Sequence, residues 1–407
     1  MTNKKLHIIY LGSSGFPYGM ASIQRLKLIS KGLVYAGFNV SVINNRSPIY
    51  KEDTIILAPR GNIEGIDYIY TAGTPYRSNT FVKRNALKLY GLLNEFILLC
   101  KLNKKKELDV AIISTMSFYA ILYYSILSKF FKFIVLLNYA EYITGKRAGA
   151  DMLLKFNYYL FDKYGLKLVN GLIPISSYLV DHIENALQAG KYIKVPILID
   201  NDKFNSKTDI LEEKYFLYCG SLGYFEVIEF ILEAFAVISP ENKDYKLYLI
   251  VKGTSEQFVL LNDKIAQRRI NGSVIIFTNL PEKDLICYYK NARALLIPIR
   301  KTVQDIARFP HKIGEYLASG SPVITNWEGE IKHYLEDGYS ALIAQGYDVN
   351  EYVDKMRDVI KNPGKAKIIG ENGKNIAGAQ FDYRKQGKRL AKFISSFKKD
   401  TCSSQIC

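Results

Sequence analysis

The chain has 407 residues, of which 48% are hydrophobic and 23% charged, and its formal net charge is +16. This composition excludes a disordered chain, and the length exceeds what one hydrophobic core organises, so we expect a globular protein of two domains. The five cysteines have no metal-ligand spacing and are too few for a disulfide framework, which indicates a reducing compartment.

Positive charge is concentrated in the first half. Residues 1–200 carry 25 Lys and Arg against 13 Asp and Glu, and residues 201–407 carry 30 against 26. A basic half indicates an acidic partner; no nucleic-acid fold signature accompanies the charge, so an anionic membrane surface fits better than nucleic acid. Because Lys4 and Lys5 lead directly into an apolar segment, we expect no signal peptide and a cytoplasmic location, with peripheral attachment to the inner face of the cell membrane as an option.

The N-terminal segment predicts a strand, a glycine loop and a helix. Residues 6–11 are apolar apart from His7, as in a strand covered on both faces. The glycines of the following loop, Gly15 and Gly19 among them, allow backbone N–H groups to approach a ligand, but their spacing matches neither the dinucleotide nor the Walker pattern. On the next helix, Arg25 is either a cation for a bound anion or an exposed helical arginine.

Residues 38–43 predict a second strand. Residues 46–80 are rich in turn-forming residues and predict no clear helix or strand. A basic amphipathic helix is expected at residues 81–100, followed by a lysine cluster at 104–106. Such a helix either lies on an anionic bilayer or carries ordinary solvated lysines.

The apolar stretch 110–138 has the pieces of a strand, a helix and a strand, interrupted by Lys129 and Lys132. We therefore interpret it as buried α/β core rather than as a membrane span. Glu141 follows the second strand, where ligands gather in open α/β sheets, so it is a candidate hydroxyl-orienting group or weak base; a solvated glutamate is the alternative. A helix to about residue 164, a strand at 171–175 and a helix capped by Ser176 come next.

The second half begins again with a strand and a glycine loop after the polar segment 201–214. This loop contains Gly220 and Ser221 but has no Arg or Lys up to Glu226. Lys252 follows another strand, at 246–251, and two further strands are expected at 274–277 and 294–298. The last helix is expected at 383–397.

The most informative stretch is residues 305–331. Pro310 suits the start of a helix, Gly320 its end, and the segment from Pro322 restarts as a strand. The N–H groups of His311, Lys312 and Ile313 would form an anion site, with Arg308 beside it. One turn further on, the carboxylate of Glu315 is placed to accept hydrogen bonds from two hydroxyls of a ribose.

This stretch resembles the donor site of family 4 glycosyltransferases, which are retaining enzymes of the GT-B fold. The matching run is Pro310-His-Lys312-Ile-Gly-Glu315-Tyr-Leu-Ala318-Ser-Gly320-Ser-Pro322-Val323. The resemblance implies an α/β fold of two Rossmann-like domains facing each other across a cleft. It implies an acceptor-side domain at 1–198, a nucleotide-sugar-binding domain at 199–380, and, at 381–407, a helix returning to the first domain with a frayed tail.

The resemblance also implies roles for the site residues. The loop with Gly15 and Gly19 would meet the donor phosphates and the acceptor, and the helix with Lys312 would bind the donor. Two departures stand out, because the first glutamate of the usual Glu-x7-Glu pair is Ala307 and the second glycine loop lacks its basic residues. The negative charge of the donor phosphates would then be neutralised by Arg308, Lys312, helix N–H groups or Lys252, without a metal ion.

The function implied is transfer of a sugar from a nucleotide diphosphate to a hydroxyl, with retention. The basic, apolar first half favours a saccharide or lipid-linked saccharide acceptor, as in bacterial surface-polysaccharide assembly. Two alternatives stay open: a non-catalytic nucleotide-sugar-binding scaffold and a GT-B sugar-nucleotide epimerase.

Overall fold

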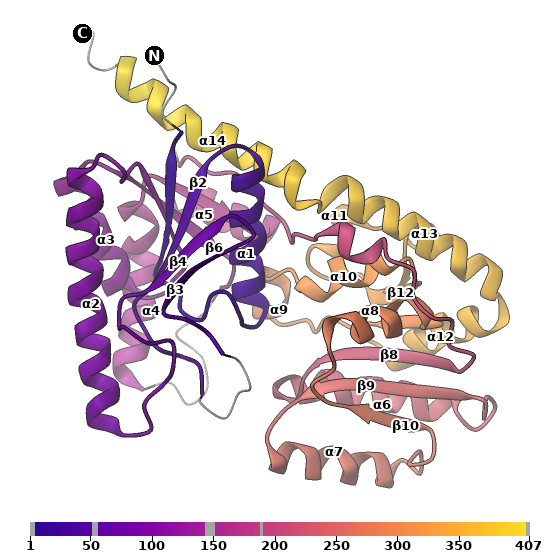
Figure 1. The fold of residues 1–407 in the computed structure, drawn as a ribbon. Helices are drawn as coiled ribbons and strands as arrows, with labels where there is room; N and C mark the ends of the chain where they lie inside the picture. The colour runs from indigo at the N-terminus through magenta and orange to yellow at the C-terminus, as the bar shows by residue number, and fades with distance from the viewer. Residues whose placement is uncertain (1–4, 51–55, 143–150, 188–189, 404–407) are drawn as a thin grey trace. The chain divides into compact units, whose positions relative to one another are not determined.

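The computed structural model describes residues 5–50, 56–142, 151–187 and 190–403 (Figure 1). The chain divides into two compact units, one of Met1–Leu198 with Tyr383–Cys407 and the other of Ile199–Asp382. The expected frayed tail includes residues 404–407, which lie outside the described residues.

The first unit is built on a seven-stranded sheet with the strand order β3-β4-β2-β1-β5-β6-β7. Its strands are β1 His7–Leu11, β2 Asn39–Asn44, β3 Arg60–Ile63, β4 Ile66–Tyr70, β5 Val110–Ile113, β6 Ile134–Tyr139 and β7 Gly171–Pro174. All neighbours pair in parallel except β3 and β4. The apolar runs at residues 6–11, 110–113 and 134–137 thus form inner strands of the sheet, because both faces of a parallel sheet are covered.

Six helices accompany this sheet: α1 Ala21–Tyr35, α2 Phe81–Lys104, α3 Phe118–Phe131, α4 Met152–Tyr164, α5 Ser177–Ala186 and α14 Tyr383–Ser403. A short 3₁₀ turn, η1 Gly165–Leu168, follows α4. In Figure 1, α2, α3 and α4 lie together on one side of the sheet, and α1 and α14 on the other. The predicted cap of α5 is confirmed, because the Ser176 side chain accepts a hydrogen bond from the backbone N–H of Leu179 over 3.2 Å.

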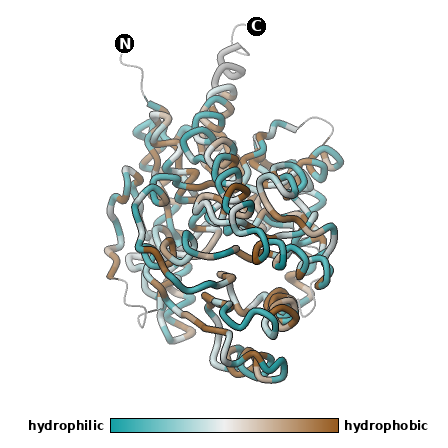
Figure 2. Tube along the Cα trace, turned by 90° about the vertical axis from the view of Figure 1, so that its right-hand side faces the viewer, coloured by the Kyte–Doolittle hydropathy of each residue, from teal (hydrophilic) through white to brown (hydrophobic). Residues whose placement is uncertain are grey.

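The C-terminal helix α14 packs lengthwise against α1. Its buried positions recur every three or four residues, at Tyr383, Gln386, Leu390, Ile394 and Phe397. Figure 2 shows the resulting alternation of hydrophilic and hydrophobic residues along the helix. The helix predicted at residues 383–397 is therefore confirmed, with the period of one buried face.

The second unit has a six-stranded, all-parallel sheet with the order β10-β9-β8-β11-β12-β13. Its strands are β8 Lys214–Ser221, β9 Tyr245–Lys252, β10 Val274–Phe277, β11 Ala294–Leu296, β12 Val323–Asn326 and β13 Leu342–Ala344. Its helices are α6 Phe225–Ile238, α7 Ser255–Gln267, α8 Glu282–Asn291, α9 Val303–Ala307, α10 His311–Ser319, α11 Ile331–Tyr334, α12 Val349–Lys361 and α13 Pro363–Gln380, with 3₁₀ turns η2 Asn201–Phe204 and η3 Leu222–Tyr224.

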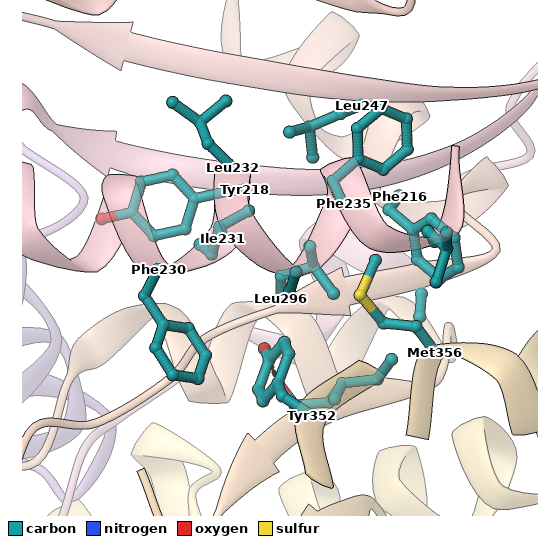
Figure 3. Packing of buried hydrophobic residues seen from close by; sticks show 14 of the residues in the cluster. Phe216, Tyr218, Phe230, Ile231, Leu232, Phe235, Leu247, Leu296, Tyr352 and Met356 are labelled. Atoms are coloured by element: carbon teal, nitrogen blue, oxygen red, sulfur yellow. Dashed lines mark hydrogen bonds between the residues drawn. The ribbon is translucent and has the colours of Figure 1, made fainter. Parts of the chain in front are cut away.

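Large apolar side chains fill the interior of the second unit. Figure 3 shows Phe230, Ile231 and Phe235 of α6 facing side chains from the sheet and from α12, including Phe216 and Tyr352. Tyr352 also donates its hydroxyl hydrogen to the backbone oxygen of Ile324 over 2.8 Å, so its one polar atom is satisfied inside the core.

The stretch 110–138 forms β5, α3 and β6, as the sequence predicted. Within the described residues, every helix is too short or too polar to cross a bilayer.

Candidate functional site

Helix α10 carries the central motif as predicted. Pro310 is its N-cap, and Gly320 ends it in the left-handed conformation at φ 83°, which glycine adopts without strain. Ile313, Tyr316 and Leu317 form its buried face. His311, Lys312 and Glu315 lie away from that face and are half-buried.

Lys312 and Glu315 form an ion pair at the start of α10. Lys312 Nζ donates to Glu315 Oε2 over 2.6 Å and to Tyr289 Oη over 3.1 Å. Burial disfavours the charge of Lys312, but the Glu315 carboxylate outweighs it and raises the pKa of the lysine. Burial likewise disfavours the charge of Glu315, but Lys312 and then His311 outweigh it and lower the pKa of the carboxyl. Both groups are therefore ionised at neutral pH.

Tyr316 anchors this helix to the sheet. Its hydroxyl accepts a hydrogen bond from the backbone N–H of Cys219, in β8, over 2.7 Å. Its ring meets that of Tyr289, on α8, edge to face at 5.1 Å between centroids. The position of Lys312 and Glu315 is thus set by three elements of the same unit.

One detail of the predicted anion site is wrong. The sequence indicated free N–H groups at residues 311–313, but the Ile313 N–H donates to the carbonyl of Pro310 over 3.1 Å. This bond tightens the first turn of α10 and removes one of the three expected donors.

A second group of cations lies just before α10. Arg300 Nε donates to Asp305 Oδ2 over 2.6 Å, and Arg308 Nη2 donates to the other oxygen of the same carboxylate. Arg308 Nη1 also donates to Tyr224 Oη over 2.7 Å, and its guanidinium carbon lies 4.5 Å from the centre of that ring. Because Tyr224 belongs to the loop after β8, Arg308 brings positive charge to the loop whose own sequence lacks it.

The glycine loop after β8 is held close to β9. Ser221 is the register partner of Lys252, and the Ser221 hydroxyl accepts the N–H of Gly223 over 3.1 Å. A Cβ on Gly253 would meet Leu222 at 2.6 Å, so glycine is required for this approach. Gly220 and Ser221 therefore lie beside the exposed Lys252 at the carboxyl edge of the sheet.

Ala307, at the position of the missing first glutamate, ends α9 and is fully buried. The turn after β12 passes close to the same helix, since a Cβ on Gly329 would lie 3.2 Å from the carbonyl oxygen of Ile306. Gly329 has φ 57°, which fits the turn predicted there. A glutamate at 307 would need a different packing of this turn.

The glycine loop of the first unit is fixed by two side chains from neighbouring strands. Asn44 Oδ1 accepts the N–H groups of Gly15 and Phe16 over 3.1 and 3.3 Å, and Tyr70 donates to the Phe16 carbonyl over 2.8 Å. The Gly15 N–H is therefore committed to Asn44. Gly19 is exposed, and a Cβ there would meet Ile23 at 2.5 Å.

Arg25, the expected cation for a bound anion, is buried, so the alternative of an exposed helical arginine is wrong. Its Nε donates to Asn138 Oδ1 over 3.0 Å, Nη1 to the Pro196 carbonyl over 2.6 Å and Nη2 to the Val195 carbonyl over 2.8 Å. Burial lowers its pKa to about 10, so it is still protonated at neutral pH. These three hydrogen bonds satisfy the buried guanidinium group within the protein, so its burial does not require a bound anion.

Glu141 follows β6, as predicted, and its side chain is exposed. It lies three residues after Asn138, which bonds to Arg25 and, over 2.9 Å, to the hydroxyl of Ser114 after β5. The carboxyl ends of β5 and β6 thus form one polar edge, with Glu141 just beyond it.

Within each unit the structure gathers part of the predicted set. His311, Lys312, Ile313 and Glu315 share the first turns of α10. Sequence reasoning missed Asp305, Tyr224, Tyr289 and Asn44, which orient the predicted residues. Only Asp305 had a sequence signal, as an acid three residues before Arg308. Among the described residues, no three His, Cys, Asp or Glu side chains are grouped to hold a metal ion.

Known proteins resemble this chain in fold throughout and in sequence over part of it. Sucrose-phosphate synthase from Thermosynechococcus elongatus aligns at TM-score 0.74 and 16% identity, over 97% of this chain and all of that one. Anabaena Alr3699/HepE, solved with UDP and glucose, aligns at TM-score 0.68 and 14% identity, over 96% of this chain and all of that one. At these identities the likeness establishes the fold, which is GT-B.

A GDP-mannose-dependent alpha-(1-6)-phosphatidylinositol monomannoside mannosyltransferase from Mycolicibacterium smegmatis is 25% identical over 124 residues. The match covers 30% of this chain and 32% of the relative, about a third of each. The family described as Glycosyl transferases group 1 matches residues 200–376, which include β8 to β13 and the whole of α10. Residues 200–376 are therefore a group 1 glycosyl transferase domain within a chain of GT-B fold.

Proposed function

We propose that this protein is a family 4 glycosyltransferase that moves a sugar from a nucleotide diphosphate to a hydroxyl group, with retention of configuration. The observation that carries the proposal is the ionised Lys312–Glu315 pair on the first turns of α10, inside the group 1 domain. A lysine at a helix N-terminus attracts phosphate, and an adjacent carboxylate accepts hydrogen bonds from sugar hydroxyls.

In this proposal Arg308 and Lys312 neutralise the diphosphate, and Glu315 holds the ribose. Support for Arg308 comes from its contact with Tyr224, which places a cation on the loop after β8. Gly220, Ser221, Lys252 and His311 would complete the donor site. The charge would be met by these cations and the α10 dipole, without a metal ion.

On the acceptor side we assign Gly19 and Glu141, which follow β1 and β6, two strands of the same sheet that run in the same direction. Because carboxyl ends of parallel strands share an edge, both are placed for a ligand there. We propose a saccharide or lipid-linked saccharide acceptor and a role in bacterial surface-polysaccharide assembly at the cytoplasmic face of the membrane. The mannosyltransferase relative, named for a phosphatidylinositol-linked acceptor, supports a lipid-linked one.

A second candidate is a non-catalytic nucleotide-sugar binder, which the buried Ala307 favours. The experiment that separates the two is release of nucleoside diphosphate from a panel of nucleotide-sugars, with and without acceptors. We expect acceptor-dependent release and a product whose anomeric proton, observed by NMR, has the donor's configuration. The absence of release with every donor and acceptor would favour the non-catalytic binder, and release without transfer, or a product of inverted configuration, would also contradict the proposal.

The variant Arg308→Met should reduce kcat/KM by about 100-fold, since a charge-assisted contact to a diphosphate contributes roughly 1.5–3 kcal/mol. Arg357→Met is the matched control. Arg357 lies on α12 with a side chain 37% exposed and an ion pair to Asp354. It should leave the rate unchanged.

A further inference from the structure

Helix α2 of the first unit has its apolar residues on the outside. Val82, Leu89, Leu93 and Phe96 are 78%, 62%, 56% and 42% exposed. Their spacing of seven, four and three residues places them on one stripe of the helix. The buried residues of α2 are Gly91, Glu95 and Leu99, so a carboxyl group faces inward while leucines face solvent. This reverses the pattern of an ordinary surface helix.

The two neighbouring helices repeat this pattern. On α3 the exposed apolar side chains are Tyr119, Ile126 and Phe130, spaced by seven and four residues. On α4, Met152 and Phe156 are four residues apart and both at least half exposed. Each of the three helices therefore presents apolar side chains to the outside.

The three helices are adjacent. α2 and α3 meet through the rings of Phe96 and Phe131, 6.3 Å apart, and α3 and α4 meet where Asn157 Oδ1 accepts the N–H of Phe118 over 3.0 Å. Figure 1 shows them together on one side of the sheet. We call the outward faces of α2, α3 and α4 the helical face.

The helical face holds most of the exposed apolar side chains of the described chain. Of 31 large apolar residues that are exposed, eight lie on α2, three on α3 and six on α4. These helices have only 24, 14 and 13 residues. Soluble monomers rarely expose so contiguous an apolar surface, which indicates a binding surface.

The charges of this face are almost all positive. The cations on the three helices are Lys83, Arg84, Lys88, Lys101, Lys104, Lys129, Lys155 and Lys163, and Lys105, Lys106 and Lys132 follow the helix ends. The acids on the helices are Glu95, which is fully buried, and Asp162, which is half-buried, and Glu107 and the exposed Asp151 lie next to the helix ends. A second copy of the face would bring the same positive charge, so the complementary partner is apolar and anionic.

We infer that the helical face docks on an anionic lipid bilayer. Leucine and phenylalanine side chains enter the acyl boundary, the tyrosines lie at the headgroup level, and the lysines contact anionic headgroups. This inference does not depend on the proposed function, since vesicle binding is measured without any sugar donor.

The test is flotation of the full chain with two kinds of vesicle, phosphatidylcholine alone and phosphatidylcholine with about one third phosphatidylglycerol. We expect binding to the anionic vesicles that weakens as salt is added. The double variant Leu89→Ser, Leu93→Ser should bind about ten-fold more weakly or worse, because two apolar insertions are lost. Both positions are exposed, and an unchanged melting temperature checks the fold.

The matched control is Val259→Ser, Leu260→Ser on α7, where the side chains are 61% and 43% exposed. It should bind like the wild type. Absence of wild-type flotation would overturn the inference, and so would equal binding of the two double variants. A concentration-dependent dimer that the Leu89, Leu93 variant abolishes, without vesicle binding, would assign the face to a second copy instead.

Discussion

Single side chains in this protein take their roles from partners far along the chain. Arg25 appears in the sequence as a helical cation, yet its guanidinium is enclosed by carbonyl oxygens of Val195 and Pro196, about 170 residues away. Glu95 is a second example, since a charged residue on a basic helix turns inward. Its Oε1 accepts from the Tyr124 hydroxyl and its Oε2 from the Asn45 amide, both over 3.0 Å.

Glu95 makes stability depend on pH. Burial raises its pKa to about 7, although Tyr124, Asn45 and the nearby Arg46 oppose the shift. The unfolded glutamate loses its proton near pH 4.5 while the folded one keeps it to about pH 7. The free energy of unfolding should therefore fall as pH rises between these values, by about 3 kcal/mol, and then level off.

Glu95→Gln should remove this fall. The measurement is urea unfolding from pH 5 to 8 for both proteins, and the difference between them isolates Glu95 from Asp162, whose pKa burial raises to about 6. If the free energies of unfolding of the two proteins change in parallel with pH over this range, the Glu95 carboxyl is not the cause of the fall.

At the scale of elements, helices α1 and α14 of the first unit cross at two glycines. A Cβ on Gly32 of α1 would meet the Tyr383 carbonyl oxygen at 2.5 Å, and a Cβ on Gly387 of α14 would meet Gly32 backbone atoms at 2.4 Å. The two backbones can approach this closely only because neither residue has a side chain.

Gly387→Leu should force α14 away from α1 and destabilise the first unit by about 3 kcal/mol, near the upper cost of overpacking. Gly364→Ala on α13 is the control, because a Cβ there has no heavy atom within 4 Å. The melting temperatures of the two variants are compared by thermal unfolding followed by circular dichroism. Equal melting temperatures would mean that α14 does not depend on this crossing.

The elements also show what the sequence could predict. Continuous apolar runs identified β1, β5, β6 and β8, because buried parallel strands differ clearly from their surroundings. The hairpin of β3 and β4 was missed, since β3 is nearly all exposed at the edge of the sheet and carries no apolar alternation. Similarly, α10 was predicted from Pro310 and Gly320. The hydrogen bond from the Ile313 N–H to the Pro310 carbonyl, which makes this N–H unavailable to a ligand, depends on backbone geometry and was not predicted.

For the whole molecule, the predicted GT-B architecture is confirmed by fold similarity, and the group 1 domain by the family match. The residues that orient the candidate site could not be predicted. Tyr224, Tyr289 and Asp305 act through contacts between separate elements, and such residues form no local pattern. The apolar helical face was only partly foreseen, because the sequence marks α2 as basic but does not reveal which stripe faces outward.

The most direct test of the account is thermal stabilisation by nucleotide-sugars, comparing the wild type with Glu315→Ala. A ligand at 100 times its Kd adds about 2.7 kcal/mol to the free energy of unfolding, which raises Tm by several degrees. We predict a shift with one nucleotide-sugar that the variant loses, while its own Tm without ligand stays within a few degrees. No shift of the wild type with any nucleotide-sugar, or an equal shift in the variant, would contradict the donor site on α10.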